Sequence, residues 1–200
     1  MLQKLQNAFT LIELLVGVAI IGILTTIAVP NFLDAQTRSK LANTYANMKA
    51  IQTAIFSYTL DYQNAPIDKG PDAFDGITYL VLTTPTAYLS SISVFQDPFK
   101  TQLEEDQGIY FAYGSPHHID QLDDPMRRQA FQKENITYFL FGWGPDRKSD
   151  WPWKLLGDTL TKLKTPSIAG PNGDGGIFYS TSNGLRSSGD VISTNFQIYE

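Results

Sequence analysis

Few residues in this 200-residue sequence have the types and spacing that catalysis requires. The chain contains no cysteine, which excludes disulfides and cysteine-based metal sites. His117 and His118 are its only histidines. Adjacent side chains on a strand point to opposite faces, so sharing one metal ion would be difficult, and an exposed loop is the simpler interpretation. Hydrolase, zinc-protease and phosphate-binding motifs are missing as well, so we expect a protein that is not an enzyme.

One set of oxygen-bearing residues could bind a hard cation. GPDRKSD provides Asp146 and Asp150, and PNGDGG provides Asn172 and Asp174. Calcium prefers carboxylate and carbonyl oxygens on tightly bent loops. No EF-hand spacing is present, however, and Asp-Gly pairs are ordinary turn formers. We therefore treat Ca²⁺ as an optional cofactor, with Asp146 and Asp150 as the first ligands and Asp174 as a further one.

A single carboxylate interrupts the longest apolar run of the chain. Glu13 is the only charged residue between Lys4 and Asp34. The run from Phe9 to Val29 would be roughly 32 Å long as a helix, which matches a hydrocarbon core of about 30 Å. It can therefore cross a membrane once. Because the basic Lys4 lies on the short side, we expect a cytoplasmic N-terminus and an extracytoplasmic remainder.

Three interpretations of this segment compete. A cleaved secretory signal would use the small residues at positions 26–28, but Glu13 and Pro30 do not suit it. A plain membrane anchor leaves Glu13 unexplained, because a carboxylate in the membrane costs about 2.5–3.5 kcal/mol and needs a partner. A cut between Ala8 and Phe9 would create an α-amino group close to Glu13 in sequence. That amine, on a neighbouring subunit, could neutralise the carboxylate inside an apolar filament core.

The run from Ala8 to Glu13 (AFTLIE), with the apolar stretch that follows, resembles the class III signal of type IV pilins and type II secretion pseudopilins. The resemblance is dense over residues 8–33. It implies that a prepilin peptidase cuts before Phe9 and methylates the new amine. It also implies that Glu13 guides docking of the subunit into a growing filament. The residue before the cut is usually glycine in that family, and here it is Ala8.

The same resemblance extends further along the chain. The family's helix-breaking glycine and proline match Gly22 and Pro30, which implies a loss of helical hydrogen bonds on assembly. Shorter stretches resemble the major, G-type pseudopilin, which has a calcium-holding loop; they are residues 82–85, 97–99, 141–146 and 179–190. The chain departs from that pattern at about residues 100–135. Implied partners are other pseudopilins, an inner-membrane assembly platform and its cytoplasmic ATPase.

Beyond Pro30 the helical pattern becomes amphipathic. Apolar or aromatic residues recur at spacings of three and four, which marks one buried helix face: Leu41, Tyr45, Met48, Ile51, Ile55, Tyr58 and Tyr62. The opposite face is expected to carry the polar residues Arg38, Lys40, Asn43, Asn47 and Gln52. The helix would therefore run from Phe9 to about Tyr62.

After residue 64 the sequence becomes rich in turn formers and short β-prone runs. Residues 77–83 predict a short helix or strand, and residues 108–113 and 136–143 predict strands. Asn183-Gly184 predicts a two-residue hairpin. We expect an α+β fold, in which a long N-terminal helix packs on an antiparallel sheet of three to five strands. The expected segments are a leader (1–8), a transmembrane and assembly helix (9–30), its amphipathic continuation (31–63) and an extracytoplasmic β-rich domain (64–200).

Two classes of function fit these features. The first is a structural subunit that polymerises through its N-terminal helix into a helical filament; the second is a single-pass anchored binding protein or enzyme. The missing catalytic motifs favour the first class. Within it, the lack of the cysteine-bounded loop common in pilins favours a secretion pseudopilin over an adhesive or motility pilin. The net charge of −5 and the scattered basic residues indicate no nucleic-acid surface.

The processing hypothesis predicts a defined mature N-terminus. Intact mass and N-terminal sequencing of the protein from its native membrane should show a chain that begins at N-methylated Phe9. A start at Val29 would indicate a secretory signal, and an uncut Met1 would indicate a plain anchor. Either result would contradict the hypothesis.

Overall fold

The computed structural model describes residues 9–68, 77–100, 109–116, 125–148, 179, 185, 189–194 and 198–199. The chain divides between Arg38 and Ser39 into two compact units, each considered by itself.

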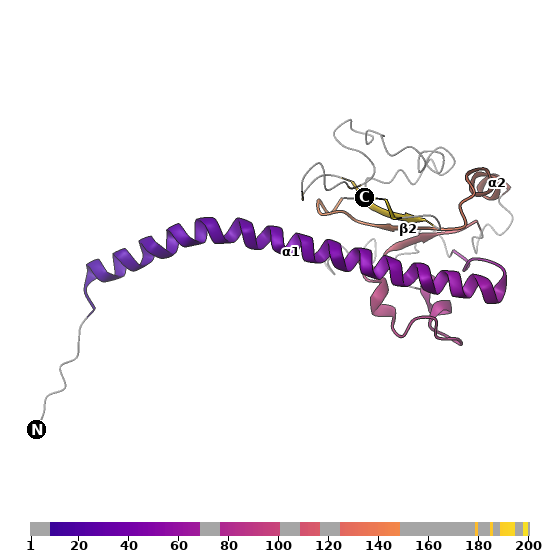
Figure 1. Ribbon diagram of the computed structural model, residues 1–200, viewed down its shortest axis with the longest axis horizontal. Coiled ribbons are helices and arrows are strands. Elements are labelled where there is room, and N and C mark those ends of the chain that lie inside the picture. The colour runs from indigo at the N-terminus through magenta and orange to yellow at the C-terminus, as the bar shows by residue number, and fades with distance from the viewer. Residues whose placement is uncertain are drawn as a thin grey trace, which may run out of the picture. The chain divides into compact units, whose positions relative to one another are not determined.

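The longest element is the helix α1, which spans Leu11–Tyr62 (Figure 1). It passes through Gly22 and Pro30 without ending, although proline lacks the N–H of a regular helical bond. The hydrogen-bond loss that the resemblance implies at these residues stays a prediction for the assembled subunit. After Tyr62 the helix stops at Gln63, whose φ of 59° is left-handed and whose N–H bonds to the Thr59 carbonyl at 2.9 Å.

The first unit consists of apolar helix surface. Every large apolar side chain between positions 9 and 33 is exposed, on all sides of the helix. Among the described residues, α1 is the one helix long and apolar enough to cross a membrane by length and composition, and its most apolar window is not buried at all. The sequence-based expectation of an apolar spanning segment therefore matches the surface of this unit.

In the second unit, one face of α1 is buried. The buried residues are Leu41, Thr44, Met48, Ile51, Ala54 and Ile55. This confirms most of the predicted apolar face, with Tyr45 and Tyr58 partly buried against the core. The assignment of Tyr62 to that face was wrong, because its side chain is 49% exposed.

Two residues assigned to the polar face of α1 instead contact the rest of the unit. The Gln52 amide donates to the Ser193 hydroxyl at 2.6 Å and to the Thr194 carbonyl at 2.9 Å. The Lys40 ammonium lies 5.8 Å from the centre of the Phe99 ring. More of the circumference of α1 therefore contacts the rest of the unit than its apolar pattern indicates, because polar side chains at the edges of the buried face also have partners.

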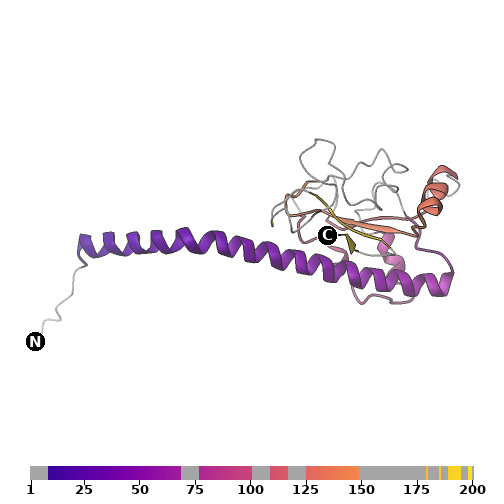
Figure 2. The same cartoon turned by 45° about the horizontal axis from the view of Figure 1, so that its top comes forward.

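The sheet has four antiparallel strands in the order β1-β2-β3-β4. Their bounds are β1 Ala112–Gly114, β2 Phe139–Gly142, β3 Val191–Thr194 and β4 Ile198–Tyr199. Both views show the sheet alongside the second half of α1 (Figures 1 and 2). The expected α+β arrangement of a long helix on a small antiparallel sheet is thereby confirmed.

The strands of the structure are shorter than the runs from which they were predicted. The run at 108–113 divides between two partners: Gln96 bridges Tyr110, and Phe111 N–H bonds to the Phe95 carbonyl at 2.8 Å, before β1 begins at Ala112. The ambiguous segment at 77–83 is a 3-10 helix, η2 (Ile77–Leu82). The proposed Asn183-Gly184 turn lies outside the described residues.

Residues 125–134, for which no element was predicted, form the helix α2 (Pro125–Glu134). Proline at its first position is compatible with a helix start, since the first N–H groups have no helical partner. The Phe131 ring of α2 stacks 6.0 Å from the Phe139 ring on one face of β2. On the other face, Gly142 lies against Met48 of α1. Because β2 is covered on both faces, all four of its residues are buried.

The buried face of α1 should carry much of the stability of the second unit. Ile51 is completely buried, so Ile51→Ala should lower the free energy of unfolding by about 2–5 kcal/mol. Phe56, one turn further on, is 64% exposed, and Phe56→Ala should change stability by less than about 0.5 kcal/mol. Urea unfolding of the detergent-solubilised chain, followed by tryptophan fluorescence, measures both values. Equal losses would contradict this packing.

Candidate functional site

The start of α1 is organised by a pair of polar side chains three residues apart. Glu13 Oε2 accepts the Thr10 backbone N–H at 2.9 Å and the Thr10 hydroxyl at 2.7 Å. In return, Thr10 Oγ1 accepts the Glu13 N–H at 3.3 Å. This reciprocal arrangement is a capping box, in which two side chains satisfy N–H groups that the first helical turn leaves unpaired. Thr10 and Glu13 thus fix where the helix begins.

The capping box also positions the Glu13 carboxylate. It lies at the N-terminal end of a helix, where the helix dipole favours negative charge. Both hydrogen bonds from Thr10 go to Oε2, so among the described residues Oε1 is available to accept a bond from outside the helix. Glu13 therefore combines a structural role in its own helix with capacity for one more donor.

The apolar surroundings of Glu13 increase the need of its carboxylate for such a donor. Leu11, Ile12, Leu14 and Leu15 are each 58–82% exposed, so the carboxylate sits in an apolar surface. If this surface is covered by lipid or by protein, the charge loses water and needs a cationic or hydrogen-bonding partner.

Phe9 places the predicted cut beside this capping box. It directly precedes Thr10, and its side chain is 80% exposed. Ala8 lies outside the described residues, so the cleavage site itself stays a prediction. Sequence reasoning did not identify Thr10, although Thr-x-x-Glu before an apolar run is the usual signal of a capping box.

The calcium hypothesis concerns the turn that follows β2. Asp146 Oδ1 accepts the Lys148 N–H at 3.2 Å, which bends the chain locally. The other proposed ligands, Asp150, Asn172 and Asp174, lie outside the described residues, as do His117, His118, Trp151 and Trp153. The described part of the chain contains no group of three or more potential ligands among His, Cys, Asp and Glu. Trp143, directly after β2, is buried.

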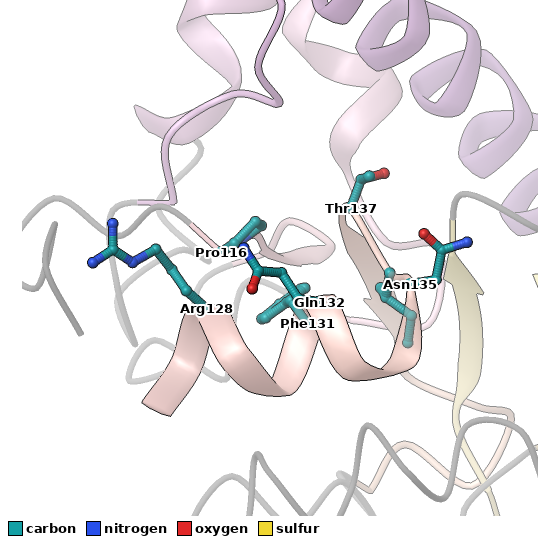
Figure 3. Close-up of a pocket in the computed structure, with 7 residues that line it drawn as sticks. Pro116, Arg128, Phe131, Gln132, Asn135 and Thr137 are labelled. Carbon is teal, nitrogen blue, oxygen red and sulfur yellow. The ribbon is translucent and has the colours of Figure 1, made fainter. Parts of the chain in front are cut away.

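One surface cavity of about 200 Å³ lies beside α2 (Figure 3). Arg128, Phe131 and Gln132 line it from the helix. Its described lining includes neither a carboxylate nor a histidine, so it offers no acid–base pair for catalysis.

Comparisons with known proteins match these features. The family described as "Prokaryotic N-terminal methylation motif" matches residues 3–29. The chain is 56% identical over 53 residues to the type IV major pilin protein PilA of Myxococcus xanthus, which covers 26% of this chain and 24% of PilA. It is 39% identical over 77 residues to the type IV major fimbrial protein FimA of Dichelobacter nodosus, covering 38% of this chain and 46% of FimA. The chain thus spans less than half the length of these pilins.

A longer match involves the type II secretion system core protein G of Aeromonas hydrophila. Identity is 31% over 125 residues, which covers 62% of this chain and 82% of that protein. No solved structure matches the chain. Because the capped apolar helix, the methylation motif and the match to most of core protein G agree, the chain belongs to the type IV pilin-like superfamily.

Proposed function

We propose that the protein is a structural filament subunit that polymerises through the N-terminal half of α1. Two observations at residues 9–33 carry this proposal. Every large apolar side chain of this stretch is exposed, and its one carboxylate is held at the start of the helix. Burying one such side chain is worth about 1.5–3 kcal/mol. A surface of this kind is stable only in lipid or against other apolar helices.

The proposed life of the subunit has two stages. The chain is first a single-pass protein of the cytoplasmic membrane, with its N-terminus inside and its C-terminal domain outside. A prepilin peptidase cuts between Ala8 and Phe9 and methylates the Phe9 amine. An inner-membrane platform, driven by its ATPase, then moves the subunit into an extracytoplasmic filament with other copies and related pseudopilins.

Glu13 gives assembly its direction in this proposal. Lipid tails are as apolar as leucine, so burial alone provides little reason for one membrane helix to prefer another. A charge pair supplies that preference, because the Phe9 amine of an incoming or neighbouring subunit can neutralise the Glu13 carboxylate through Oε1. The Thr10 bonds to Oε2 keep the carboxylate at the helix start during this exchange.

Within the superfamily we favour a role in protein secretion. The alignment to core protein G extends over 125 residues and so exceeds the 62 residues that precede the end of α1. It therefore includes residues of the β-rich domain. The pilin alignments extend over 53 and 77 residues, close to the 62 residues that precede the end of α1, and they support an adhesive or motility pilin as the alternative.

The assembly role of Glu13 can be separated from its capping role. Glu13→Ala removes both functions and should leave membrane insertion intact while reducing sheared-filament yield by at least about tenfold, a loss of about 1.4 kcal/mol in assembly. Glu13→Gln keeps an oxygen that accepts the Thr10 bonds but removes the charge. It should therefore reduce the filament yield as much as Glu13→Ala does. Thr25→Ala, which alters another exposed hydroxyl of the same segment, should assemble normally. Wild-type filament yield from both Glu13 variants would contradict the proposal.

We further propose that calcium binds the turn after β2 through Asp146, with Asp150 and Asp174 as further ligands. A ligand that binds only the folded chain stabilises it, by about 2.7 kcal/mol at a hundredfold excess over Kd. Calcium should therefore raise the thermal midpoint relative to chelator, magnesium should not, and Asp146→Ala should abolish the gain. Asp61→Asn, which changes a carboxylate on α1, serves as the control. Identical melting in calcium and chelator would refute this site.

A further inference from the structure

A buried carboxylate joins two distant parts of the second unit. Asp97 is 3% exposed and follows the 3-10 helix η3 (Ile92–Phe95). Its Oδ1 accepts the Phe99 N–H at 2.9 Å, and its Oδ2 accepts the Trp143 N–H at 2.6 Å. The first bond closes the turn at residues 97–99, and the second attaches that turn to the residue directly after β2.

Two lysines face this carboxylate. Lys100, from the same turn, is 8% exposed, and its ammonium lies 4.6 Å from the centre of the Trp143 ring. Lys40 approaches from α1, with its ammonium over the Phe99 ring. The turn therefore holds Trp143 at two points, its backbone N–H by Asp97 and its ring by Lys100.

We propose that Asp97 is a proton-operated clamp, whose ionised carboxylate locks the turn at residues 97–100 onto Trp143 and whose protonation loosens that lock. A carboxylate accepts N–H bonds roughly twice as strongly as a neutral carboxyl group. Both Asp97 oxygens are engaged by backbone N–H groups, so a proton added to either oxygen weakens one of the two bonds. This device lies outside the filament-forming helix surface and does not depend on the proposed function.

The clamp should respond near physiological pH. Burial raises the pKa of Asp97 to about 6, against the lowering effects of the Phe99 and Trp143 N–H groups and of Lys100 and Lys40. The unfolded chain takes up this proton only near the ordinary value of 3.8. Between these values the folded state binds more protons, so the contribution of Asp97 to the free energy of unfolding rises as the pH falls. Loosening is therefore local, and the domain stays folded.

The residue that follows Trp143 makes a close backbone contact. Trp143 is followed by Gly144, where a Cβ atom would lie only 2.0 Å from the Gly189 carbonyl oxygen. A change at the Trp143 N–H would therefore act directly beside a backbone contact that leaves no room for a side chain at position 144.

The test follows the Trp143 amide in the full chain. The protein is labelled with ¹⁵N-tryptophan, purified in detergent micelles and titrated from pH 8 to 4.5. Three backbone signals are expected from the three tryptophans, and Trp143→Phe assigns the relevant one. The Trp143 amide should shift with a midpoint near pH 6, Asp97→Asn should abolish this titration, and Asp61→Asn should preserve it. The protection of the Trp143 amide against exchange, taken relative to the intrinsic exchange rate at each pH, should fall at the acidic end.

Two results would overturn the clamp: a Trp143 amide that is flat between pH 8 and 4.5, or an unchanged titration in Asp97→Asn. If Asp97→Asn does not fold, Lys100→Met provides the decisive variant. It retains an apolar stem over the Trp143 ring but removes the nearest cation, so the midpoint should move to higher pH. An unchanged midpoint in Lys100→Met would equally refute the role of Asp97.

Discussion

The apolar surface of residues 9–33 has to be kept out of water, and this requirement shapes the first unit. A soluble helix solves the problem by burying one face, as α1 does between Leu41 and Ile55. Residues 9–33 have no polar face to leave outside, so no single partner surface could cover them. They need an environment that surrounds the helix, which a lipid bilayer or a bundle of identical helices provides. In such surroundings a helix can contain proline and glycine, because neighbouring helices and hydroxyl side chains can satisfy the freed backbone groups.

Glu13 is the exception within that surface, and its geometry shows how a charge can be kept there. Two bonds from Thr10 satisfy one carboxylate oxygen within the same helical turn. The cost of moving the group out of water is thereby reduced before any second chain is present. Among the described residues, Oε1 accepts no hydrogen bond, so it can take a donor from a second chain under the proposed assembly.

Much of this architecture could be predicted because it depends on local patterns. The apolar run and the spacing of Leu41, Met48 and Ile51 follow from helical periodicity, which the sequence carries directly. The strand ends did not follow, because residues 109–111 pair with a segment near Phe95 rather than with β2. Gln52 was predicted to face solvent because it is polar, and its partners become apparent only in the tertiary fold. Thr10 was not predicted as a cap, although its signal, Thr-x-x-Glu before an apolar run, is local.

The two bonds of Gln52 have a mechanical consequence. Apolar packing between a helix and a sheet is non-directional and resists sliding weakly, whereas hydrogen bonds to Ser193 and Thr194 have fixed lengths and angles. They tie α1 to β3 near the C-terminal end of the buried face, so a slip of one residue along the helix would break both. A force that pulls the chain by its helix loads these bonds in shear, together with the side chains packed around them. Gln52 therefore fixes the register between α1 and β3, so a force on the helix is transmitted to the sheet.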